Sequence, residues 1–241
     1  MIKSVFELLL IFHLLGDFYF QTEKMALEKA GKYRGVIKHS IIYVICFLGC
    51  MFVLFPNIPF HFLIIPGVAH AFIDSVKFMI CKNVKDGKGV FLMDQILHLM
   101  TILIVVYYIC DFNIYNVCNM KLKSVLDNLN IVETEVFAWI LKLLVIHKPA
   151  NILIGKILGE YKTEHDSRNN EKNAGELVGT LERILMVIFV SIGQFSAVGL
   201  VLTAKSIARY DKISHDKKFA EYYLLGTLLS AIIAIVTALL I

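Results

Sequence analysis

The feature that most constrains this chain is a series of apolar runs, several of which approach the length of a bilayer crossing. A transmembrane helix needs about 20 predominantly apolar residues. We expect spans near residues 2–21, 39–56, 60–80, 90–110, 182–204 and 220–240. Charged residues make up 18% of the chain, against roughly 25% in soluble domains. The sequence therefore predicts an all-α, polytopic transmembrane bundle of about six to seven spans. The first run contains ionisable residues and no clear cleavage site, so we expect it to remain as a span.

One further apolar stretch, residues 135–158, contains the interruption "IHKPAN" at 146–151. A proline breaks the helical hydrogen-bond ladder, and a buried lysine is costly in a membrane. The pattern favours a broken or re-entrant helix over a full crossing, and the full crossing stays open as the alternative. We expect three regions: a four-helix unit at 1–112, a connector at 113–180 and a helical pair at 181–241. The connector includes a mixed-charge stretch at 160–176, which we expect to be a solvated loop.

The basic residues predict the orientation of the chain in the bilayer, because cytoplasmic loops are enriched in lysine and arginine. The connection between the second and third spans has neither residue type. The connections after the first and third spans carry nine of these residues, which are Lys24, Lys29, Lys32, Arg34, Lys38, Lys77, Lys82, Lys85 and Lys88. We therefore expect an N-terminus outside the cell, and first and third connections in the cytoplasm.

Histidine and aspartate recur four residues apart inside three of the apolar runs. The first run has "HLLGD", the third has "HAFID", and the fourth has the reversed order in "DQILH". Residues four apart share one face of a helix. Because the fourth span runs in the opposite direction to the first and third, the reversed order places all three pairs at the same level. His39 opens the second span at that end. Seven side chains are therefore predicted to converge near the cytoplasmic surface: His13, Asp17, His39, His70, Asp74, Asp94 and His98.

A metal ion gives a physical reason to gather carboxylates and imidazoles in an apolar environment. Ionisable groups inside a membrane are expensive and usually mark function. Mixed imidazole and carboxylate donors suit Zn²⁺, with Mn²⁺ and Fe²⁺ as alternatives. Seven ligands exceed the needs of one tetrahedral zinc ion, so a one- or two-metal site is predicted. A proton or ion pathway and a structural hydrogen-bond network remain alternatives for the same residues.

Several polar residues near the predicted cytoplasmic rim are candidates for binding a substrate, because a cation beside a metal is suited to holding phosphate. The same cations are also explained as ordinary anchors at the membrane surface. The candidates are Gln21, Arg34, Lys38, Lys77, Lys205 and Arg209.

The pattern "HLLGDFYFQ", the start of "KHSIIY", "HAFIDSVK" and "FLMDQILHL" resembles a family of uncharacterised bacterial membrane proteins. "GELVGTLERIL", "TAKSIARY" and "EYYLLGTLLS" extend the resemblance into the C-terminal half. That family is distantly similar to membrane-bound metal-dependent hydrolases, which are grouped with zinc phospholipase C and P1 nuclease. The resemblance implies metal-dependent hydrolysis of phosphoesters. Those soluble enzymes use an N-terminal amino group as a metal ligand, a feature that Met1, far from His13, cannot supply.

We therefore expect a phosphoester hydrolase, acting on a lipid-linked substrate from the cytoplasmic side. In this hypothesis a metal-bound hydroxide attacks phosphorus, Asp94 is a ligand with a catalytic role, and His39 is a ligand or the general base. A metal-ion or proton-coupled transporter is the alternative. The expected partners are membrane lipids, a lipid-phosphate substrate and further copies of the chain. No nucleic-acid binding is expected, because the basic residues lie in loops that the topology explains.

Overall fold

The computed structural model describes residues 2–54, 60–84, 86–111, 120–161 and 169–241, which form helices and contain no strand. The predicted all-α class is confirmed. Helices or helix pairs long and apolar enough to cross a membrane lie at Ile64–Cys81, Lys88–Asp111, Glu133–Leu158 and Lys217–Leu240. The chain divides into two compact units, Met1–Leu141 and Lys142–Ile241. Residues 55 and 56 of the second expected span and parts of the expected connector lie outside the described residues.

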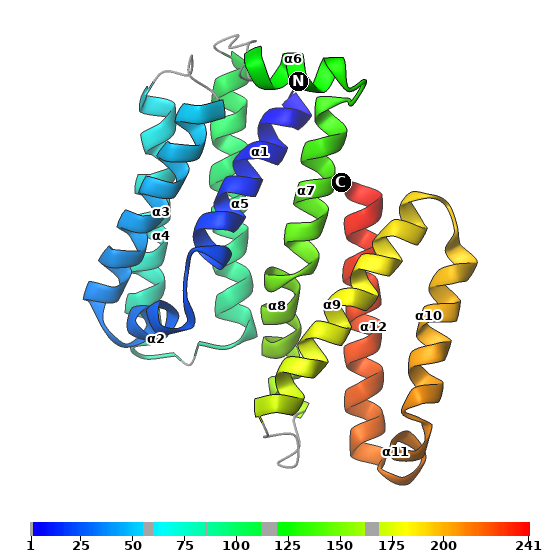
Figure 1. Cartoon of the computed structure of the whole chain (residues 1–241). Helices are drawn as coiled ribbons and strands as arrows, with labels where there is room; N and C mark the ends of the chain where they lie inside the picture. The colour runs from blue at the N-terminus through cyan, green and yellow to red at the C-terminus, as the bar shows by residue number, and fades with distance from the viewer. Residues whose placement is uncertain (1, 55–59, 85, 112–119, 162–168) are drawn as a thin grey trace. The chain divides into compact units, whose positions relative to one another are not determined.

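Four helices of the first unit pack into a closed bundle (Figure 1). Helix α1 contacts both α3 and α5, and α4 also contacts both. Helix α6 lies at the end of this unit opposite to α2 (Figure 1). The bounds are α1 Ile2–Leu14, α3 Tyr33–Leu54, α4 Phe60–Cys81, α5 Lys88–Asp111 and α6 Met120–Asn128, followed by α7 Glu133–Ile146.

The short helix α2, Glu23–Gly31, lies across one end of this bundle (Figure 1). Thr22 begins it as an N-cap, with a side-chain oxygen that accepts a hydrogen bond from the Met25 amide at 3.3 Å. No residue of α2 is buried. Helix α3 approaches it closely at Gly35, where a Cβ would lie 2.4–2.5 Å from backbone atoms of Glu28 and Lys29. Gly35 therefore allows α2 to lie against α3 with Lys29 near the bundle axis.

The end of the first predicted span is a π-helical turn, η1, at Leu15–Tyr19. The Phe20 amide donates to the Leu15 carbonyl at 2.8 Å, which is the five-residue spacing of a π turn. Such single wide turns are frequent at functional sites. Gly16 in this turn faces the Tyr43 ring, and a Cβ there would lie 2.6 Å from Tyr43 Cδ2. The turn therefore brings the backbone of the first span directly against a side chain of α3.

The second unit begins within α7 and includes the break expected in "IHKPAN". Helix α7 ends at Ile146 and α8, Lys148–Leu158, restarts after His147 with Pro149 in its first turn. The buried guanidinium of Arg183 satisfies the broken end, because its Nε donates to the Ile146 carbonyl at 2.6 Å. Its other nitrogens donate to Ser230 at 3.1 Å, to Thr180 at 3.1 Å and to Asn151.

The prediction of one continuous span at 182–204 is wrong. Helix α9, Asn169–Ser191, ends within this range, and α10, Phe195–Ala208, begins after three intervening residues. Gly193 between them has φ +74°, a left-handed conformation that glycine adopts readily. The Gln194 amide then donates to the Phe189 carbonyl at 2.7 Å, and the chain reverses into a helical hairpin (Figure 1). From residue 169, the expected loop at 160–176 is also helical. Helices α11, Tyr210–His215, and α12, Lys217–Leu240, complete the unit.

Candidate metal centre

Two histidines and two aspartates from three helical segments meet inside the first unit. The Nε2 atoms of His39 and His70 lie 3.1 Å apart. Asp17 Oδ1 is 3.2 Å from His39 Nε2 and 4.0 Å from His70 Nε2. Asp74 Oδ2 is 3.6 Å from His39 Nε2 and 3.3 Å from His70 Nε2. Asp17 comes from η1, His39 from α3, and the other two residues from consecutive turns of α4.

These separations are those expected of atoms that share one metal ion. Tetrahedral ligands at about 2.0–2.1 Å from zinc lie roughly 3.3 Å from one another. Two overlapping groups in the described part of the chain have one potential ligand atom per residue within 4.8 Å of the others: Asp17, His39 and His70, and His70, Asp74 and His98. All five residues are buried. The structure brings these five of the seven expected residues together, and the buried groups could hold a metal ion.

His98 on α5 presents a nitrogen with the chemistry of a ligand. Its Nδ1 lies 2.8 Å from the backbone carbonyl oxygen of Asp94, which can only accept a hydrogen bond. Nδ1 therefore carries the proton, and in the neutral ring Nε2 keeps its lone pair. Nε2 of His98 is buried and has no hydrogen-bond partner among the described residues. A backbone carbonyl that fixes the tautomer in this way is common behind metal-binding histidines.

His13 lies beside the centre and has different partners from Asp17, its neighbour in the sequence pattern. The His13 ring stacks on His98 with centroids 5.1 Å apart, and its Nδ1 shares a 3.2 Å hydrogen bond with the Tyr43 hydroxyl. The Tyr43 ring lies parallel to the His70 ring at 3.6 Å between centroids. Tyr43 therefore fixes the orientation of one histidine through a hydrogen bond and of another through stacking.

Two lysines and a glutamine contact the carboxylates. Lys29 Nζ is 2.7 Å from Asp74 Oδ2 and 3.7 Å from Asp17 Oδ1. Lys77 Nζ is 2.9 Å from Asp94 Oδ2. The Gln95 amide lies 3.2 Å from both Asp17 Oδ2 and Asp94 Oδ2 and donates to them. Asp94 is therefore connected to the centre through Gln95, and its Oδ1 is buried with no hydrogen-bond partner in the described part of the molecule.

The other expected substrate-binding residues of the first unit have different surroundings. Gln21 is partly buried, and its Oε1 has no hydrogen-bond partner within the described residues. Arg34 is exposed. Lys38 is also exposed and lies 3.7 Å from Glu28 on α2. Of the expected cations, Lys77 directly contacts Asp94, the carboxylate that Gln95 connects to the centre.

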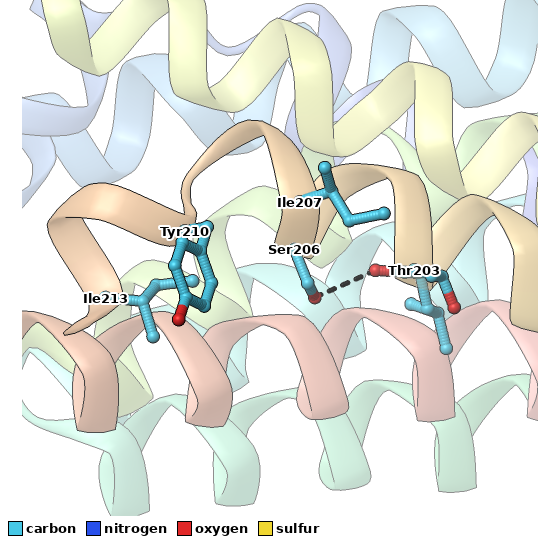
Figure 2. A pocket seen from close by; sticks show the side chains of 6 residues that line it. Thr203, Ser206, Ile207, Tyr210 and Ile213 are labelled. Carbon is cyan, nitrogen blue, oxygen red and sulfur yellow. Dashed lines mark hydrogen bonds between the residues drawn. The ribbon is translucent and has the colours of Figure 1, made fainter.

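Lys205 and Arg209 belong to the second unit. Lys205 Nζ is 2.5 Å from Glu182 Oε2 and 5.5 Å from the centre of the Tyr223 ring, so it joins α10 to α9 and α12. Arg209 is exposed at the end of α10. A surface pocket of about 380 Å³ lies nearby (Figure 2). It is lined by apolar and hydroxyl side chains, which are Leu202, Thr203, Ser206, Ile207, Tyr210 and Ile213. This pocket has none of the histidine and carboxylate groups that metal chemistry requires.

Three residues of the centre are absent from the sequence-based prediction. Tyr43 lies four residues after His39, so the helical spacing could have found it. Gln95 adjoins Asp94 and is polar within an apolar run, which is also a usable signal. Lys29 has no such signal, because it is one of several lysines in a basic connection. Only the position of α2 across the bundle reveals its contact with Asp74.

A protein-family profile described as "Protein of unknown function (DUF3307)" matches residues 5–132. The matched stretch contains all seven predicted ligands and both lysines of the centre. No curated protein and no solved structure matches the chain. The family match is in accord with the resemblance to uncharacterised membrane proteins, and the distant likeness to phospholipase C and P1 nuclease remains a prediction. Because the matched residues cover more than half of the chain, the protein belongs to DUF3307, a family of unknown function.

Proposed function

We propose that this protein is a membrane-embedded, metal-dependent hydrolase of phosphoesters. The observation that carries the proposal is the approach of two imidazole nitrogens and two carboxylate oxygens to one point, with separations of 3.1–4.0 Å. Lysine ammonium groups adjoin the carboxylates on two sides. A metal bound by such a donor set polarises a phosphoryl oxygen and activates water. The adjacent cations match the negative charge that a phosphoryl group carries.

Zn²⁺ is the metal that this donor set suits best, because it accepts both imidazole and carboxylate ligands in a compact site. The two overlapping groups that share His70 support one ion or two. His39, His70, Asp17 and Asp74 would hold one ion, and His98, which forms a group with His70 and Asp74, would supply a further ligand. The Asp94 carboxylate contacts Lys77 and Gln95 and would hold both side chains beside the proposed metal site.

The proposed substrate is a lipid-linked phosphoester in the inner leaflet. His39 lies near the start of α3 and Asp74 in the second half of α4, so both lie toward the end of the bundle that α2 crosses (Figure 1). The basic connections at this end favour a cytoplasmic location under the positive-inside rule. A centre within the bundle yet near this surface is suited to a headgroup that remains attached to its lipid.

The test measures phosphate release by protein purified in maltoside detergent and loaded with zinc or manganese. The substrates are a phospholipid, a polyprenyl phosphate and a nucleotide, and the variant is Asp94→Asn. We expect release from a lipid-linked substrate by the wild-type protein and loss of release in the variant. The neutral amide cannot pair with Lys77 as the carboxylate does. A metal-loaded wild-type protein that hydrolyses none of these substrates would contradict the proposal.

A metal-ion or proton carrier is the second candidate, and one observation favours it. The buried polar groups continue beyond the central four through His98 to His13, and through Gln95 to Asp94. Rows of exchangeable groups inside a membrane often form ion or proton pathways. Flux of metal into sealed vesicles, abolished by Asp94→Asn, without hydrolysis of any tested substrate would favour this carrier over the hydrolase.

A further inference from the structure

Lys29 is the basic residue that α2 contributes to the centre. Its side chain is 14% exposed, whereas the Asp74 side chain behind it is fully buried. The ammonium touches Asp74 at 2.7 Å and approaches Asp17 at 3.7 Å. Helix α2 has no buried residue, so Lys29 extends from a surface helix toward two buried carboxylates. Lys29 therefore lies between the outside of the bundle and the proposed metal ligands.

The charge of the cluster favours an anionic ligand once a metal is bound. The cluster contains the carboxylates of Asp17, Asp74 and Asp94 and the ammonium groups of Lys29 and Lys77. With neutral histidines these groups sum to one negative charge, and a divalent metal converts this to one positive charge. An uncompensated charge is costly in an apolar environment. Binding of an anion at the metal would neutralise it.

We infer that Lys29 binds the phosphoryl oxygen of a ligand at this metal centre. This inference rests on the proposed function and assigns its anion-binding residue. An ammonium has three donors, so Lys29 is able to retain Asp74 and also donate to a ligand oxygen. Arg34 and Lys38 do not share this geometry, since Arg34 is exposed and Lys38 lies against Glu28. The group that Lys29 binds is a phosphoryl group, which belongs either to a lipid headgroup or to free phosphate.

The test measures anion binding without turnover. Full-length protein in maltoside micelles, which carry no phosphoryl group, is loaded with Co²⁺, whose visible spectrum reports changes in its ligands. One arm titrates inorganic phosphate, and the other titrates phosphatidic acid mixed into the micelles. The variants are Lys29→Gln and Lys29→Arg. Lys24→Gln, on the same helix at an exposed position, is the matched control.

We expect Lys29→Gln to bind Co²⁺ with the wild-type spectrum and to weaken phosphoryl binding about 10-fold to 100-fold, the range for a lost charge-assisted hydrogen bond. Lys29→Arg should recover most of the affinity, and Lys24→Gln should leave it unchanged. Weakening in only one arm would assign Lys29 to that source of the phosphoryl group. Unchanged affinity in both arms overturns the inference, as does loss of Co²⁺ binding in Lys29→Gln. A wild-type protein that binds no Co²⁺ contradicts the metal centre itself, which is a separate outcome.

Discussion

The Nε2 atoms of His39 and His70 face each other at 3.1 Å, although the two residues lie on different helices and 31 positions apart. Both side chains are buried. A metal cation bound at this point would be coordinated by both imidazole nitrogens through their lone pairs. Asp17 and Asp74 carboxylate oxygens lie 3.2–4.0 Å from the same nitrogens and supply the negative charge that such a cation requires.

The first prediction concerns metal content. Protein purified without chelator should retain roughly one to two equivalents of transition metal, following the ligand count. The double variant His70→Ala and Asp74→Ala should lose most of it, because His70 belongs to both groups of potential ligands. Elemental analysis by mass spectrometry gives the content. The matched control is His215→Ala with Asp127→Ala, both exposed. Folded wild-type protein that neither retains metal nor rebinds zinc or manganese would exclude this centre.

The second prediction concerns Gly16. Alanine there places a Cβ 2.6 Å from the Tyr43 ring, which must shift from its present stacking on His70. Overpacking of this kind costs about 1–3 kcal/mol. We expect a lower melting temperature and weaker metal binding, measured by thermal unfolding and by zinc titration. Gly49→Ala, on the same helix as Tyr43 and with no neighbour within 4 Å, is the control. Equal behaviour of the two variants would show that Tyr43 does not position the histidine.

The third prediction concerns Arg183. Replacement by leucine leaves the Ile146 carbonyl and the side chains of Asn151 and Ser230 without their donor. Each buried polar group left without a partner costs about 1–3 kcal/mol. We expect a fall in thermal stability, with faster proteolysis in α8 and α9. The exposed Arg209→Leu is the control. Because no ligand of the metal centre lies in the second unit, metal content per folded protein should remain unchanged, and its loss would contradict the independence of the two units.

The fourth prediction concerns orientation. A cysteine at Val84, in a cysteine-free background, should react with an impermeant reagent only from the cytoplasmic side. A cysteine at Asn130, next to α6 at the opposite end of the first unit, should react only from outside (Figure 1). The reason is the excess of lysine and arginine in the connections near α2. Labelling in the reverse pattern would place the centre at the outer face and change the pool of substrates it meets. Lys85, in the basic connection after the third expected span, and Asn57, in the connection without basic residues, lie outside the described residues.

Much of the candidate site follows from local spacing. His70 and Asp74 share a face of α4, and Asp94 and His98 share a face of α5, because four residues nearly complete a helical turn. The reversed order in α5 follows from its reversed direction. The same reasoning is incomplete for His13 and Asp17. The π turn at Leu15–Tyr19 directs them to different partners, and a wide turn leaves no simple mark in hydrophobic periodicity.

The sequence by itself determined the all-α class, the apolar helices and the end of the bundle where histidine and aspartate gather, because these depend on composition and on a period of 3.6 residues. Only the tertiary structure decided that Lys29 reaches Asp74, that Tyr43 stacks on His70, and that residues 182–204 form two helices. The first two depend on the close approach of segments distant in sequence, which glycines at positions 16 and 35 permit. The third depends on one left-handed glycine inside an apolar run, where hydrophobicity favours a continuous span and the backbone conformation of Gly193 ends it.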